Sequence, residues 1–269
     1  MSHRDTVTPL LLEAGRIIRT ATLVETAGGV TEKGADSANL VTYYDTAVQA
    51  YLIEHLRAAY PDAAFMAEEQ ENDPAVLAAE RCFIIDPIDG TANFIHGYRR
   101  SAISLAMLER REIVLAAVHD PYLDETFTAE RGKGAYLNGT PIHVSEREPR
   151  NALCVFGTTP YEKEKFGAAT FRLAEAVFRK TRDVRRSGSA ALDLAHVAAG
   201  RCDLFFELAL SPWDIAAGIL LIREAGGRIG SRNGAPLDLA GRAPVFAGNP
   251  VCYDYLIRLA TDILPPLDL

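Results

Sequence analysis

Residues 84–97 read IIDPIDGTANFIHG, and this stretch decides the fold of the chain. The apolar run CFII at residues 82–85 ends abruptly in acids, a proline and a glycine, which is typical of a buried strand that delivers a loop at its carboxyl end. Asp86 and Asp89 are three residues apart across a turn that contains Pro87, so both carboxylates can point at one spot. Two like charges ~4 Å apart repel by roughly 4 kcal/mol at an effective dielectric constant near 20.

Further acids follow apolar runs elsewhere in the chain. Glu68 and Glu69 come directly after AFMA, and Asp214 opens a helix after SPW. Any one of them could be a solvated acid in a turn, but three or four carboxylates brought together need cations to stay ionised. Oxygen ligands of high charge select hard ions, Mg²⁺ first, with Mn²⁺ or Ca²⁺ as substitutes. The hydroxyl of Thr91 could hold a water, and the N–H groups of Gly90 and Thr91 would cradle an anion if a helix starts there.

The order of elements predicts an α/β protein in two halves. The apolar spacing predicts helices from Val7 to about Ala27 and from Asp45 to about Tyr60, and paired strands with an Asn138-Gly139 hairpin turn. After about residue 146, strands and helices alternate. We therefore expect an α+β half over residues 1–145 and an α/β half over residues 146–269. The expected strands lie at 82–85, 101–108, 113–120, 151–157 and 202–208, and the expected later helices at 164–180, 187–200, 213–227 and 253–260.

Composition excludes several classes of protein. With 48% hydrophobic and 24% charged residues, the 269-residue chain is typical of a globular protein and not of a disordered one. The net charge of −8 argues against nucleic-acid binding. The longest apolar runs fall short of the ~20 residues of a membrane span. The four cysteines are dispersed, so we expect free thiols, no zinc site and a cytoplasmic protein.

The motifs together resemble the inositol monophosphatase family of Mg²⁺-dependent, lithium-sensitive phosphomonoesterases. IIDPIDGTANFIHG resembles its first signature, and SPWDIAAGILLIREAGG at residues 211–227 resembles its second. AFMAEEQ, LVTYYD at residues 40–45 and RRSGSAALDLAHVAAG resemble three further family segments. The resemblance runs in order from about residue 10 to 260. It implies the layered α-β-α-β-α sandwich of the sugar phosphatases and a homodimer.

The resemblance also implies the site residues and two or three Mg²⁺ ions. Glu68, Asp86 and the carbonyl of Ile88 match ligands of a first metal. Asp86, Asp89 and Asp214 match those of a second, and Glu68 would share in a weaker third site. The remaining matches are Thr91, which with Glu68 orients the attacking water, Asp45 and Lys33 near the metals, and Gly90, Thr91, Gly188, Ser189, Ala190, Glu207 and Arg185 around the substrate.

The implied activity is hydrolysis of inositol monophosphate by in-line attack of a metal-activated water. The shared motifs build the metal site and not the pocket for the leaving group, so other small substrates stay open: fructose 1,6-bisphosphate, histidinol phosphate, 3′-phosphoadenosine 5′-phosphate or NADP. A non-catalytic dimeric relative is the alternative of another class. Arg99 and Arg100 could approach a second phosphate or lie at a subunit interface. Position favours one of Arg185 and Arg186 near the substrate. We expect the acidic turns at Asp120 and Asp124 to face solvent.

Overall fold

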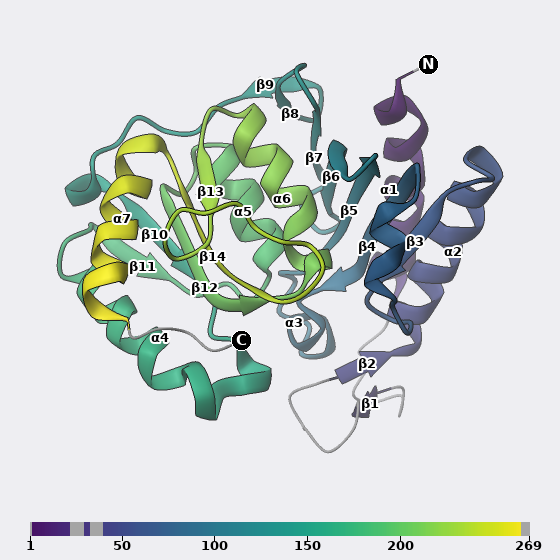
Figure 1. Ribbon diagram of the computed structural model, residues 1–269. Helices are drawn as coiled ribbons and strands as arrows, with labels where there is room; N and C mark the ends of the chain where they lie inside the picture. The colour runs from purple at the N-terminus through teal and green to yellow at the C-terminus, as the bar shows by residue number, and fades with distance from the viewer. Residues whose placement is uncertain (1, 22–29, 33–39, 265–269) are drawn as a thin grey trace.

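The computed structural model describes residues 2–21, 30–32 and 40–264, and they form five layers (Figure 1). Two sheets alternate with three layers of helices, and each layer of helices has an apolar core of its own against a sheet. The expected α-β-α-β-α sandwich is therefore confirmed.

The first helical layer consists of α1 (His3–Thr20) and α2 (Tyr43–Ala59). Ser2 and Asp5 form a capping box that begins α1. The helix ends earlier than the sequence predicts, and residues 22–27 of that prediction lie outside the described part. α2 follows the short antiparallel pair β1 (Val30–Glu32) and β2 (Leu40–Thr42), and begins at Tyr43 instead of Asp45 because Thr42 caps it.

The first sheet, in the N-terminal half, is mostly antiparallel. Of its described strands, only the first two pair in parallel, and the others form an antiparallel meander. The predicted strands at 101–108 and 113–120 and the hairpin turn at Asn138-Gly139 are confirmed. In sheet order the strands are β3 (Ala64–Ala67), β4 (Arg81–Asp89), β5 (Ala102–Glu109), β6 (Glu112–Asp120), β7 (Glu125–Glu130), β8 (Ala135–Leu137) and β9 (Thr140–Ile142), with η2 (Pro74–Ala78) between the first two.

The middle layer consists of α5 (Ala190–Ala198) and α6 (Pro212–Glu224), which lie between the two sheets. Every residue of α5 is buried, and α6 is apolar around most of its surface. A helix that contacts a sheet on both sides has no solvent-facing stripe, so this composition is what the position requires.

The second sheet and the outer helices complete the C-terminal half. The sheet order is β11-β10-β12-β14-β13, in which β10 pairs in parallel with both neighbours and β14 pairs antiparallel with both of its own. The division at residue 145 falls between the sheets and stays a prediction, since α6 contacts both of them. The elements are η3 (Pro149–Asn151), β10 (Leu153–Phe156), α4 (Lys163–Phe178), β11 (Asp183–Arg185), β12 (Leu204–Leu210), β13 (Arg228–Gly230), β14 (Ala243–Gly248) and α7 (Pro250–Ile263).

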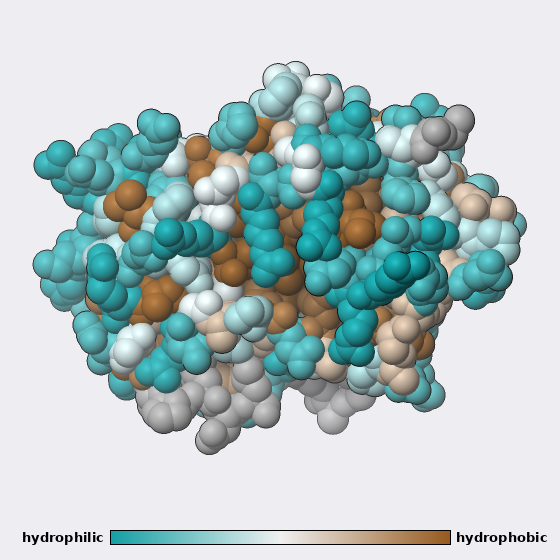
Figure 2. Space-filling model, turned by 45° about the horizontal axis from the view of Figure 1, so that its top comes forward, coloured by the Kyte–Doolittle hydropathy of each residue, from teal (hydrophilic) through white to brown (hydrophobic). Residues whose placement is uncertain are grey.

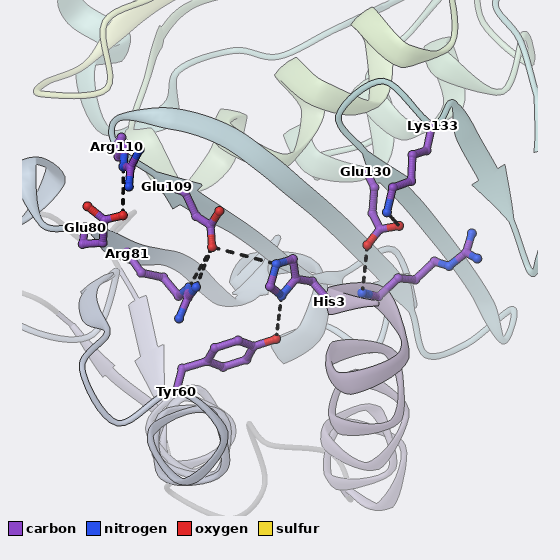
Figure 3. A network of polar contacts seen from close by, with 9 residues as sticks. His3, Tyr60, Glu80, Arg81, Glu109, Arg110, Glu130 and Lys133 are labelled. Carbon is purple, nitrogen blue, oxygen red and sulfur yellow. Dashed lines mark hydrogen bonds and ion pairs between the residues drawn. The ribbon is translucent and has the colours of Figure 1, made fainter. Parts of the chain in front are cut away.

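A polar network fastens the first helical layer to the end of the first sheet (Figure 3). The hydroxyl of Tyr60, after α2, lies 3.0 Å from Nδ1 of His3 at the start of α1. Nε2 of His3 faces Glu109 at the end of β5, at 3.9 Å. Glu109 also accepts from Arg81 at 2.6 Å, and the guanidinium of Arg81 lies 5.0 Å from the centre of the Tyr60 ring. The network therefore joins both helices to β4 and β5.

The surface is mostly hydrophilic on the face shown in Figure 2, with apolar residues visible between long polar side chains. Within the described ranges, no helix has the length and hydropathy needed to cross a bilayer. The expectation that Asp120 faces solvent is wrong. It ends β6 with no exposed surface, and its carboxylate accepts from the N–H groups of Tyr122 and Leu123 at 2.9 and 3.1 Å, so the turn folds back over it.

Candidate active site

β4 carries two of the site's acids, and its alternating side chains explain where the first one points. Cys82 and Ile84 pack in the core shared with α5 and α6. Phe83 and Ile85 pack in the core beneath α1 and α2. With a period of two residues, Asp86 continues the first set and faces the middle layer.

A bulge in β4 explains the position of Asp89. Regular alternation would place Asp86 and Ile88 on one face and Asp89 on the other. The pairing register with β5 shifts between Asp86 and Asp89. Ile88 is then fully buried in the core beneath α1 and α2, and Asp89 returns to the face of Asp86.

The third acid comes from the other half of the chain. Asp214 lies in the first turn of α6, and its Oδ2 accepts from the N–H of Ser211 at 2.7 Å. The hydroxyl of Ser104 on β5 donates to the Trp213 carbonyl at 3.1 Å, which fixes the start of this helix against the first sheet. Carboxylate oxygens of Asp86, Asp89 and Asp214 lie within 4.8 Å of one another. Glu68, after β3, lines the same cavity.

Burial and mutual repulsion penalise the ionised forms of these acids. Burial is the main cause that raises the pKa of Asp86 well above its usual range, and the charges of Glu68, Asp89 and Asp214 add to it. The pKa of Asp214 is raised well above its usual range by burial and then by Asp89 and Glu68. Burial raises the pKa of Asp89 to about 6, although hydrogen bonds from Ser189 and Ala191 oppose the shift. Without a cation, this cluster is destabilised at neutral pH.

The donor set fits divalent metal ions. Buried carboxylates that repel one another become favourable when a cation neutralises them, and hard cations take oxygen ligands. Asp86, Asp89 and Asp214 could hold Mg²⁺, with Glu68 and Ile88 on the wall of the same cavity. The structure therefore brings together all five residues that the sequence assigned to metal binding.

Thr91 and Asp45 meet at the edge of this cluster. Thr91 begins the short helix α3 (Thr91–Ile95), and its hydroxyl lies 3.2 Å from Asp45 Oδ1 and 3.1 Å from the Ile88 carbonyl. Asp45 is fully buried, and its other oxygen accepts from the N–H and hydroxyl of Thr42 at 2.8 and 2.5 Å. Burial raises the pKa of Asp45. Lys33, predicted to lie nearby, is outside the described residues.

The cavity has two adjoining lobes that share Asp89, Thr91, Tyr161 and Glu207. The lobe over the carboxylates measures about 290 Å³ and the second lobe about 300 Å³. Gly90, Gly188, Ser189 and Ala190 line the second lobe, as the sequence predicts.

Glu207, predicted to contact the substrate, lies in both lobes and is held by the loop after β10. Its Oε1 accepts from the N–H of Thr159 at 2.7 Å, and a Cβ on Gly157 would fall 1.7 Å from its Oε2. Burial raises its pKa to about 7, and the charge of Asp89 adds to the shift.

Sequence reasoning missed several wall residues, among them Thr159, Tyr161 and Asp193, and chose the wrong arginine. Thr159 lines the carboxylate lobe and Tyr161 lines both lobes, the latter on η4 (Pro160–Glu162), but this loop contains no motif that could have marked it. Asp193, on α5, lines the second lobe and is 2% exposed. Arg185 is exposed and pairs with Asp183, away from the cavity, whereas Arg186 lines the second lobe.

Fold and site define a layered α/β protein with a buried carboxylate centre, suited to divalent cations, at the base of a two-lobed cavity. The chain belongs to the inositol monophosphatase family, a family of phosphatases whose model matches residues 4–264.

Proteins similar to this chain have names that describe different activities. A fructose-1,6-bisphosphatase/inositol-1-monophosphatase of Thermotoga maritima is 37% identical over 233 residues, 87% of each chain. The Nus factor SuhB of Escherichia coli K12 is 38% identical over 239 residues, 88% of each chain. The solved inositol monophosphatase of Anabaena superposes with a TM-score of 0.82 at 34% identity and covers 97% of this chain and 96% of its own.

Proposed function

We propose that this protein is a Mg²⁺-dependent phosphomonoesterase that hydrolyses inositol monophosphate. The observation that carries the proposal is the convergence of Asp86, Asp89 and Asp214 within 4.8 Å in a buried site. A protein that used this site only as a scaffold would gain nothing from burying acids that repel one another. The names of the Thermotoga and Anabaena relatives support inositol monophosphate as the substrate.

The second lobe supports a polyol as the leaving group. Glu207 is a buried acceptor that a substrate hydroxyl can reach, and Arg186 supplies a cation on the same wall. A polyol phosphate would place its phosphate over the carboxylate lobe and its hydroxyls beside Glu207. Arg186 would also suit a second phosphate, so fructose 1,6-bisphosphate is the strongest competing substrate.

The residues of the chain have separate roles in the proposed reaction. Bound Mg²⁺ would supply the positive charge that stabilises the phosphoryl oxygens and would lower the pKa of a nearby water. The single hydroxyl proton of Thr91 can go to Asp45 or to the Ile88 carbonyl, which leaves the Thr91 oxygen free to accept a hydrogen bond from the attacking water. Glu207 orients the leaving group.

The test is phosphate release from a substrate panel with and without Mg²⁺, compared by kcat/KM. The panel contains inositol 1-phosphate, fructose 1,6-bisphosphate, histidinol phosphate, 3′-phosphoadenosine 5′-phosphate and NADP. We expect Mg²⁺-dependent release with inositol 1-phosphate preferred, and none from Asp89→Asn. A higher kcat/KM for another member of the panel would refute inositol monophosphate as the substrate. No turnover on any of them would favour a non-catalytic relative, as the name of the SuhB proteins allows.

We further propose that the chain is a homodimer and that Li⁺ inhibits it, as the family resemblance implies. Tyr98, which precedes Arg99 in the chain, is 63% exposed, and so large an exposed apolar side chain suits a subunit contact. Light scattering at micromolar concentration tests the first statement, with a monomer as the contrary result. Assays in LiCl against equal NaCl test the second, and equal rates would contradict it.

A further inference from the structure

Asp193 is a buried acid in the cavity wall beside the proposed metal site. It lies on α5, is 2% exposed and lines the second lobe of the cavity. An acid in such a place is costly unless it is hydrogen-bonded. The hydrogen bond that Asp193 accepts indicates its role in the structure.

Asp193 holds the serine that begins the turn before α5. The hydroxyl of Ser187 donates to Asp193 Oδ1 at 2.6 Å. The same hydroxyl oxygen accepts from the N–H of Ser189 at 3.3 Å. A hydroxyl has one proton, so its donation to Asp193 leaves the oxygen as the acceptor for Ser189 and fixes the turn's conformation.

The other end of this turn holds a predicted metal ligand. The hydroxyl of Ser189 donates to Asp89 Oδ2, and the N–H of Ala191 donates to the same oxygen at 2.7 Å. The oxygen of Ser189 also accepts from the N–H of Leu192 at 3.4 Å, as the cap of α5. The turn therefore orients a carboxylate that belongs to the other half of the chain.

The turn is held from a second side as well. Nδ2 of Asn93 donates to the carbonyls of Ser187 and Arg100 at 2.9 and 2.7 Å. Gly188 has a φ of +94°, and a Cβ on it would lie 2.8 Å from Asn93 Nδ2. Asn93 fixes the backbone of the turn from α3, and Asp193 fixes it from α5.

We propose that Asp193 is a positioning residue that, through Ser187, holds the turn whose Ser189 orients Asp89 for metal binding. The proposal rests on the metal site of the proposed function but not on its substrate. Direct partners of metal ligands typically contribute 10- to 100-fold to metal affinity. Asp193 acts on such a partner, Ser189, through Ser187, so a loss at the lower end of this range is expected when Asp193 is removed.

The experiment measures binding of Mn²⁺ alone, a hard cation that substitutes for Mg²⁺, from the loss of the free-ion electron paramagnetic resonance signal. We expect Asp193→Ala and Ser187→Ala each to raise the dissociation constant about 10-fold. Asp193→Asn keeps an oxygen acceptor, and it should bind close to wild type. Burial raises the pKa of Asp193 to about 8, so a neutral side chain is tolerated there. Asp183→Ala, which removes a half-exposed acid outside the cavity, is the matched control.

Three results would overturn the proposal. Wild-type affinity in Asp193→Ala would show that the turn needs no such support. Equal losses in the Ala and Asn variants would show that an oxygen acceptor at this position does not hold the turn. A lowered unfolding temperature with unchanged affinity would show a structural role only. If Asp193→Ala does not fold, Ser187→Ala decides the matter. Tight Mn²⁺ binding by wild type without turnover on any phosphate monoester would refute the proposed function and leave this proposal standing.

Discussion

Replacing Asp89 by Asn should stabilise the metal-free protein while it abolishes turnover. Asp89 is 8% exposed and lies in a cluster with Asp86 and Asp214. Its ionised form is disfavoured in the folded state by burial. An amide avoids that penalty, and its oxygen still accepts from the N–H of Ala191.

The pKa of Asp89 gives the size of the effect. Folding raises it from 3.8 to about 6. Each unit corresponds to about 1.36 kcal/mol, so ionised Asp89 destabilises the fold by about 3 kcal/mol at pH 7. The folded state binds the proton of Asp89 more tightly than the unfolded state does. The stability contributed by protonated Asp89 is therefore fully present below pH 3.8 and is lost as the pH rises through about 6. At pH 5 only about half of the loss has occurred.

Thermal unfolding in EDTA measures the difference. At about 2–4 °C per kcal/mol, Asp89→Asn should unfold about 6–12 °C above wild type at pH 7 and by about half that margin at pH 5. Asp62→Asn, at an exposed turn, should behave as wild type. Added Mg²⁺ should raise the unfolding temperature of wild type more than that of the variant. No gain in EDTA at pH 7, or the same gain at pH 5, would refute the electrostatic explanation.

Three further substitutions test other contacts. Thr91→Ala should lower kcat about 100-fold with little change in KM, because it removes the hydroxyl beside the reacting water; an unchanged kcat in steady-state assays would remove that role. Gly157→Ala should raise KM and destabilise the fold by about 1–3 kcal/mol in urea, because the new methyl group displaces Glu207. Its control is Gly167→Ala, at an open helix position, which should be slightly stabilising; equal effects of the two would contradict the steric argument. Tyr60→Phe should lower the free energy of unfolding by about 1 kcal/mol, because Nδ1 of His3 loses its hydrogen bond to the Tyr60 hydroxyl. An unchanged urea midpoint would show that this hydrogen bond contributes nothing to stability.

The sequence predicted the elements and residues whose chemistry is local. The abrupt change from CFII to acids predicted a strand that ends at residue 85, whereas β4 continues through both acids to Asp89 because a bulge accommodates them. Alternation along the chain distinguishes the two halves. Asp86, Asp89 and Asp214 could be brought together in advance because each follows an apolar run in a recognisable motif. Turn chemistry predicted the Asn138-Gly139 hairpin for the same reason, since two residues suffice to specify it.

Other features of the site depend on contacts between segments that are distant in the sequence, and a local sequence pattern does not predict such contacts. Tyr161 reaches the cavity only because the second sheet places its loop opposite β4. Arg185 ends the short edge strand β11 and Arg186 follows it. Which of the two lines the cavity depends on the position of this strand, which is set by its pairing with β10. Asp193 resembles any acid near a helix start until the packing of α5 buries it.

The bulge between Asp86 and Asp89 has a consequence for how this chain can change over evolutionary time. Substitutions around the two acids alter the chemistry gradually, but one residue inserted or deleted between them, with the bulge kept, would exchange the faces of β4 beyond it. A single deletion would then put Asp89 at the position of Ile88, toward the apolar core beneath α1 and α2, and Gly90 at the position of Asp89. Related sequences can therefore diverge in the letters of this segment far more readily than in its length.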